Sequence, residues 1–117
     1  MVWTVEFYKD ENGRSPVEEF LDGIENTKLR AKVLRDIELL ATHGTALREP
    51  FAVHVENGVW ELRTKQSSNI ARTFYFIFAN NKIILLHGMV KKKQKADRSD
   101  ILQAEKRKED YVRRNKL

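Results

Sequence analysis

Three strand-like segments joined by short turns constrain the fold of this chain more than any other feature. Val59 to Lys65 alternates apolar and polar residues, Ile70 to Ala79 is aromatic at even positions, and Ile83 to Val90 is apolar almost throughout. Alternation with a period of two is typical of a half-buried strand, and a continuous apolar run is typical of a central one. Because their connections are short, the three segments are predicted to be antiparallel neighbours in one sheet.

Shorter signals predict the first half of the chain. Trp3 to Tyr8 alternates like a strand, and Val53 to Val55 is read as a short edge strand. Ser15 and Glu18 form a capping-box pattern with a proline between them, which predicts the start of a helix. An apolar stripe over about 27–42 predicts a second helix, with a cap at Asn26-Thr27.

The order of these elements predicts an α+β protein. A charged helix is expected from about Asp97 to about Asn115, and its few apolar residues mean that it packs weakly, frays or binds a partner. The first two helices are nearly contiguous, which favours an αα-hairpin. We therefore expect a small antiparallel sheet with its helices on one face.

Length and composition narrow the class of protein. With 117 residues, a single domain spanning 1–117 is expected, and a large cofactor-binding fold is excluded. The lack of cysteine excludes a disulfide framework, a zinc finger and a thiol nucleophile. The longest apolar run, Ile83–Leu86, is far shorter than the ~20 residues of a membrane span, and there is no signal-peptide pattern. A cytoplasmic protein without a membrane partner is expected.

Charge is distributed unevenly along the chain. Residues 1–60 contain seven Lys/Arg and eleven Asp/Glu, a net of −4, whereas residues 61–117 contain fifteen and six, a net of +9. Such asymmetry suggests a polyanion as partner, although a solvated basic surface without a partner would give the same count. The basic residues of the last helix, around Lys106 to Lys108, are interpreted as peripheral.

The cations at the ends of the predicted strands are the candidate site. Arg72 lies in a strand whose following even positions are phenylalanines, so it must reach solvent or meet an anion, because an unpaired buried charge is costly. Arg63 and Lys65 end the preceding strand, and a lysine-rich run directly follows Val90. Three neighbouring strands thus bring cations to one end or face of the sheet. Guanidinium and ammonium groups there suit phosphate.

Other kinds of site have weaker support. His43, His54 and His87 are far apart in the sequence and show no metal-ligand spacing, so no metal is predicted. There is no P-loop, no dinucleotide fingerprint and no nucleophile elbow. Hydrolysis by paired carboxylates stays open, but the acidic residues lie mainly on helix faces, where they are more often solvated.

Several motifs together resemble the HigB branch of the RelE toxin superfamily. They are Val59–Arg63 (VWELR), Ala71–Phe76 (ARTFYF), Leu86–Lys95 (LHGMVKKKQK) and Ala104–Arg107 (AEKR). The resemblance implies a RelE-like fold and a ribonuclease toxin of a type II toxin–antitoxin pair, acting on mRNA, usually on the ribosome. It implies no metal or cofactor. The ribose 2′-OH attacks the adjacent phosphorus and the 5′ oxygen leaves, which requires positive charge around a phosphorane.

The resemblance also suggests roles for individual residues. Arg72 would stabilise the transition state, and Lys91 and Lys92 would bind phosphate and transfer protons, the latter role needing a lowered pKa, which crowding by other cations favours. Arg63 would be either catalytic or paired with Glu61 or an acidic helix. The remaining substrate-binding candidates are Lys65, Lys93, Gln94 and Lys95. The positions at which RelE itself has its acid–base residues differ here, so proton transfer is unassigned, with Tyr75 and His87 as candidates.

The partners follow from the same resemblance. We expect a helix-turn-helix antitoxin of the HigA type, which covers either the basic face or the acidic helices, in a toxin–antitoxin heterotetramer. Two other functions stay open at this point. One is a non-catalytic RNA- or DNA-binding module with salt-dependent phosphate contacts. The other is an interaction protein whose basic half binds an acidic partner.

Overall fold

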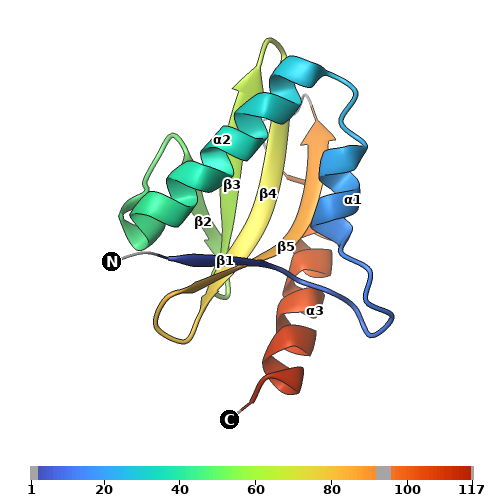
Figure 1. Cartoon of the computed structure of the whole chain (residues 1–117), viewed down its shortest axis with the longest axis vertical. Coiled ribbons are helices and arrows are strands. Elements are labelled where there is room, and N and C mark those ends of the chain that lie inside the picture. The colour runs from blue at the N-terminus through green and yellow to red at the C-terminus, as the bar shows by residue number, and fades with distance from the viewer. Residues whose placement is uncertain (1–2, 92–95, 117) are drawn as a thin grey trace.

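A five-stranded sheet and three helices form the fold (Figure 1). The computed structural model describes residues 3–91 and 96–116. The strands are β1 (Thr4–Phe7), β2 (Ala52–Glu56), β3 (Val59–Gln66), β4 (Asn69–Phe78) and β5 (Lys82–Lys91). The helices are α1 (Pro16–Asp22), α2 (Thr27–His43) and α3 (Arg98–Arg114), with a short 3₁₀ turn at Gly44–Ala46. The α+β class and the positions of these elements agree with the sequence.

The order of the strands is β1-β5-β4-β3-β2. Strands β2 to β5 form the predicted antiparallel meander, but β1 pairs with β5 in parallel, with Thr4 opposite Lys82. The expectation of a wholly antiparallel sheet is therefore wrong. The chain leaves β1 through α1 and α2, so β1 takes the free edge of β5 rather than that of its neighbour in sequence.

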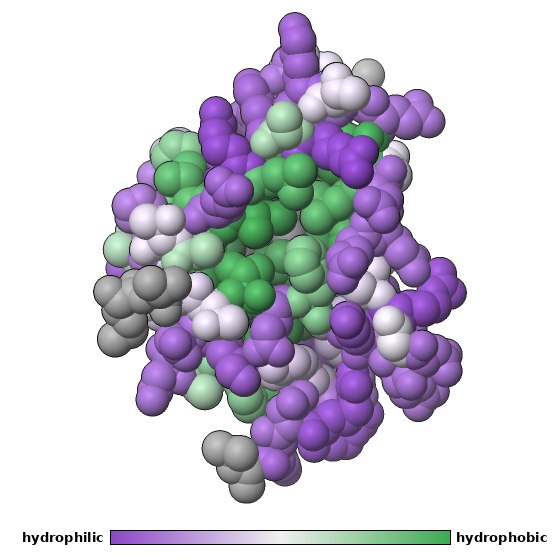
Figure 2. Space-filling model, in the orientation of Figure 1, coloured by the Kyte–Doolittle hydropathy of each residue, from purple (hydrophilic) through white to green (hydrophobic). Residues whose placement is uncertain are grey.

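The helices cover both faces of the sheet, which corrects the expectation of helices on one face. The α1 and α2 side chains pack with Leu62, Ala71 and Leu85, whereas Ala104 and Tyr111 of α3 pack with Phe74 on the opposite face. Figure 2 shows apolar side chains between α1 and α2, framed by hydrophilic ones. Because β4 and β5 are apolar on both faces, each face needs a cover.

Local contacts fix these helices at their starts and on the sheet. Ser15 accepts a hydrogen bond from the Glu18 backbone N–H at 3.3 Å, and Asn26 accepts from two backbone N–H groups of α2. A Cβ at Gly88 of β5 would lie 2.2 Å from the ring of Phe20, so only glycine lets α1 approach the strand this closely. Across the other face, the Tyr8 hydroxyl donates to Asp110 of α3 at 2.7 Å.

Candidate functional site

The predicted cations lie at one end of the sheet, where β3 and β5 end and β4 begins. The backbone register places Arg63 opposite Arg72 and Arg72 opposite Met89, and the next row on the same face contains Lys65, Ile70 and Lys91. We call Arg63, Lys65, Arg72 and Lys91 the cationic sheet end. Lys92, Lys93, Gln94 and Lys95 lie outside the described residues.

A β-bulge in β5 brings His87 and Lys91 to the face that α3 covers. The register shifts between Phe74 and Tyr75, so that Phe74 pairs with His87 while Tyr75 pairs with Leu85. The extra residue reverses the alternation of β5 beyond this point. His87 therefore stacks against Phe74, with ring centroids 5.9 Å apart, instead of facing α1 and α2.

Arg72 is a buried member of an ion-pair cluster. Its side chain is 0% exposed and its guanidinium contacts Glu61, which is itself buried in β3. Arg63, at 32% exposure, donates from Nε to the same Glu61 oxygen at 3.2 Å. Glu61 of the neighbouring strand is thus the anion that the sequence predicted for Arg72 if its side chain is buried. Of the two arginines, only Arg63 has a side chain that reaches solvent.

Lys91 is held by two carboxylates at the start of α3. Its Nζ contacts Asp97 and lies 2.9 Å from Oδ2 of Asp100. The hydrogen bonds that Lys91 donates, first to Asp97 and then to Asp100, raise its pKa above the ordinary value. The expectation of a lowered lysine pKa is wrong for this residue, because its two acidic neighbours outweigh the effect of burial. Lys91 is therefore suited to stabilise charge rather than to act as a base.

His87 lies at the centre of a polar network. Its Nε2 lies 2.9 Å from Oδ1 of Asp100, and its Nδ1 accepts from Arg107 at 2.9 Å. Since Arg107 can only donate, the neutral tautomer with a proton on Nε2 satisfies both contacts. Burial lowers the pKa of His87, and the nearby Arg107 adds to this effect, against the opposing hydrogen bond to Asp100.

Asp100 and Arg107 tie α3 to this network. Burial would raise the pKa of Asp100, but the hydrogen bonds from His87 and Lys91 outweigh it and keep the pKa below its ordinary value. Arg107 also donates to the backbone carbonyl of Leu86 at 3.0 Å, and burial lowers its pKa. Arg107 is thus part of the site, in contrast to its sequence-based interpretation as peripheral.

Tyr75 lies on the other face of the sheet. It packs in the core beneath α2, and burial raises the pKa of its hydroxyl to about 12. The structure therefore brings His87 and Lys91 together with Arg72 on one face, and it leaves Tyr75 apart from them.

One family model matches residues 19–109, a stretch that runs from α1 through most of α3 and contains the whole cationic sheet end. Its description is phage-derived protein Gp49-like (DUF891). The chain belongs to the Gp49-like family. This is a RelE-like toxin family of toxin–antitoxin systems, and membership in it suggests an antitoxin as partner. No curated protein matched the sequence.

Two acidic residues of this Gp49-like protein were missed as site residues from the sequence. Asp97 and Asp100 are spaced three apart at the start of α3, so both face the end of β5. The signal that could have found them is their position directly after the lysine run, where negative charge at a helix N-terminus is also favourable.

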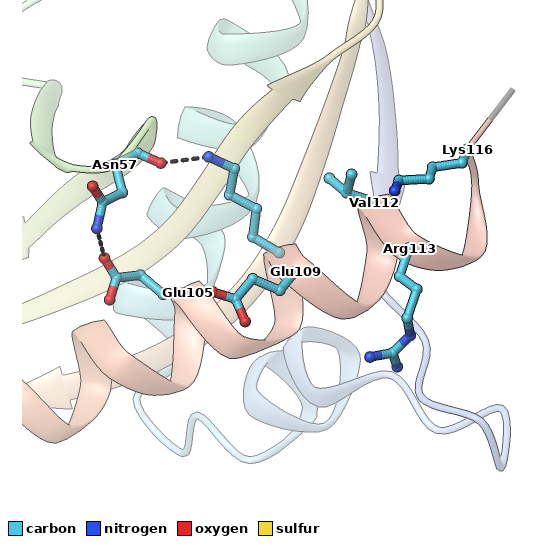
Figure 3. A pocket seen from close by; sticks show the side chains of 7 residues that line it. Asn57, Glu105, Glu109, Val112, Arg113 and Lys116 are labelled. Carbon is cyan, nitrogen blue, oxygen red and sulfur yellow. Dashed lines mark hydrogen bonds between the residues drawn. The ribbon is translucent and has the colours of Figure 1, made fainter.

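A separate pocket of about 420 Å³ lies along α3 (Figure 3). Lys108 donates to the backbone carbonyl of Asn57, and the Asn57 amide donates to Glu105, so these contacts attach the β2–β3 turn to the helix. The pocket contains none of the predicted site residues. Within residues 3–91 and 96–116, no three His, Asp or Glu side chains gather as metal ligands, and no helix is long and apolar enough to cross a membrane.

Proposed function

We propose that this Gp49-like protein is a HigB-like toxin that cleaves mRNA without a metal ion. The observation that supports this most is the cationic sheet end, where three neighbouring strands contribute Arg63, Lys65, Arg72 and Lys91 to one face. Arginine and lysine are the side chains that bind phosphate most effectively. Positive groups fixed before the reaction can stabilise the charge that develops on a phosphorane.

The proposed reaction is a transfer within the RNA strand. The 2′-OH loses its proton and attacks the adjacent phosphorus, the bond to the 5′ oxygen breaks, and that oxygen takes up a proton. The products are a 2′,3′-cyclic phosphate and a free 5′-OH. Arg63, Lys65 and Lys91 would contact phosphate directly, and Lys92, Lys93, Gln94 and Lys95 remain proposed ligands from the sequence.

Arg72 has two candidate roles. Direct stabilisation of the transition state stays a prediction, and the burial of its side chain against Glu61 favours a positioning role that keeps Arg63 in place. His87 is the proposed proton-transfer group on this face, since Asp100 orients its ring. Tyr75 stays a weaker candidate because of its place on the other face.

The remaining proposals concern context. The single domain would have a RelE-like arrangement, the reaction would take place on ribosomes in the cytoplasm, and a HigA-like antitoxin would hold the toxin in a heterotetramer. Family membership and the motifs at the ends of β3, β4 and β5 support this reading.

A non-catalytic RNA-binding module is the second candidate, and one observation favours it. Both ring nitrogens of His87 are engaged and Lys91 is ion-paired, so these two proton-transfer candidates are occupied by protein partners. Such a protein would bind RNA with strong salt dependence and release no product.

Digestion of RNA by the purified protein distinguishes the two, with and without ribosomes and with chelator. Arg63→Ala and Lys65→Ala should reduce cleavage strongly, whereas Lys28→Ala, at an exposed position in α2, should not. Cleavage with a cyclic phosphate end, unaffected by chelator, supports the proposal. Binding without any cleavage, ribosomes included, favours the binding module, and equal activity of all three variants contradicts the site.

A further inference from the structure

An exposed aromatic side chain lies beside the cationic sheet end. Phe51, in the segment leading into β2, is 40% exposed, and in the described part of the chain no other phenylalanine, tyrosine or tryptophan is classed as exposed. A single exposed apolar residue is ordinary on a protein surface. This one differs because it lines a cleft that it shares with Arg63 and Lys65.

The cleft has fixed walls. The Phe51 backbone N–H donates to Arg48 at 3.0 Å, and its carbonyl accepts from the Arg63 N–H at 2.8 Å, so the ring projects from a held backbone. On the α2 side, Thr64 donates to the buried Asp36 at 2.8 Å. The cleft is therefore built from the sheet, the segment before β2 and α2 together.

Size and charge indicate what would fit. The cleft has a volume of about 290 Å³ and is also lined by Arg35 and Pro50, whereas pockets for drug-sized ligands are roughly 300–1,000 Å³. It is thus large enough for one flat group. Its charged rim contains two arginines and a lysine, and aromatic rings flanked by cations are how proteins bind unpaired bases with their phosphates.

We propose that this cleft binds one unpaired base of the RNA strand, stacked on Phe51, while Arg63 and Lys65 contact its phosphates. The inference rests on the proposed function, because it assumes that the cationic sheet end binds RNA. Lys65 and Lys91 are separated by Ile70 of β4, or about 10 Å at two strand spacings. The stacked base and a phosphate at Lys91 would therefore belong to neighbouring nucleotides of one strand.

The test compares binding of two short fluorescent oligonucleotides by anisotropy. Both strands carry 2′-O-methyl groups, which prevent attack by the 2′ oxygen. The two strands have the same phosphates, but one has its bases and the other is abasic. The wild type should bind the base-containing strand roughly 5- to 150-fold more tightly, the range expected for stacking of one base. Phe51→Ala and Phe51→Leu should lose most of this difference, and Phe51→Trp should keep it.

Leu102→Ala is the matched control, since this α3 side chain is 49% exposed and lies outside the cleft. Thermal unfolding of each variant establishes that it is folded, and Phe51→Leu separates ring stacking from apolar volume. Full affinity in Phe51→Leu, or equal affinity of wild type and Phe51→Ala for the base-containing strand, overturns the base subsite. If Arg63→Ala still weakens binding in that case, the proposed function survives.

Two further outcomes would also overturn the base subsite. If the wild type binds neither strand but still cleaves RNA on ribosomes, the subsite is overturned and the proposed function survives; if it neither binds nor cleaves RNA, both are overturned. Loss of antitoxin binding in Phe51→Ala, with RNA binding unchanged, assigns the cleft to a protein partner and also overturns the base subsite.

Discussion

Removal of the Glu61 carboxylate is expected to destabilise the protein strongly, because Glu61 contacts Arg63 and the fully buried Arg72. Breaking a buried ion pair by deleting one partner costs about 3–5 kcal/mol. For a chain of this length, about 1 kcal/mol corresponds to ~4 °C in Tm. Glu61→Ala should therefore lower the Tm by about 12–20 °C. Arg72→Met should cost less, since Glu61 keeps its contact with Arg63.

Urea unfolding followed by circular dichroism measures these differences without the ionic screening of guanidinium. The double variant Glu61→Leu with Arg72→Met replaces the pair by apolar side chains, which is often neutral or stabilising, so it should recover most of the loss. A Glu61→Ala protein within about 1 kcal/mol of the wild type, or a double variant no better than Glu61→Ala, would refute this reasoning. The same series shows whether any lost activity in Arg72 variants reflects chemistry or stability.

Three other changes test the fold and the site. The pKa of His87 is lower in the folded protein than in the unfolded chain, so the unfolded chain takes up the second imidazole proton more readily. The free energy of unfolding should therefore fall as the pH drops below about 6.5. His87→Gln should flatten that part of the pH profile in urea titrations, and an unchanged slope counts against the assignment. Gly88→Ala should cost about 1–3 kcal/mol by overpacking against Phe20, and Phe20→Leu should relieve part of it in thermal melts. Tyr75→Phe should retain growth inhibition on expression, and a loss would place the Tyr75 hydroxyl in the reaction.

Local signals in the sequence predicted most of the fold. The period-two pattern gave β3 and β4, and side-chain caps at Ser15 and Asn26 marked the starts of α1 and α2. The face covered by α3 and the parallel partner of β1 could not be predicted in the same way. Strands that are apolar on both faces accept a helix on either side, so the choice depends on packing across the whole chain.

The sequence predicted the basic residues of the candidate site but not its acidic ones, Asp97 and Asp100. Arg63, Lys65 and Lys91 do share one face, but Lys91 reaches it only because of a bulge in β5 that a regular alternation does not contain. Asp100 acts on His87 and Lys91 from another element, α3, which reaches them only through tertiary packing. Hydrogen bonds and ion pairs between elements far apart in the sequence could not be predicted from strand ends and motifs alone.

The parallel pairing of β1 with β5 has a consequence for synthesis of the protein. Strand β1 is synthesised well before β5, with which it pairs, Thr4 lying opposite Lys82. Contacts so distant in sequence form late, because the entropy of closing the long loop is lost before the contacts stabilise it. A nascent chain that ends before β5 leaves both β1 and β4 without their shared neighbour. The order of translation therefore delays assembly of the cationic face until β5 has been synthesised.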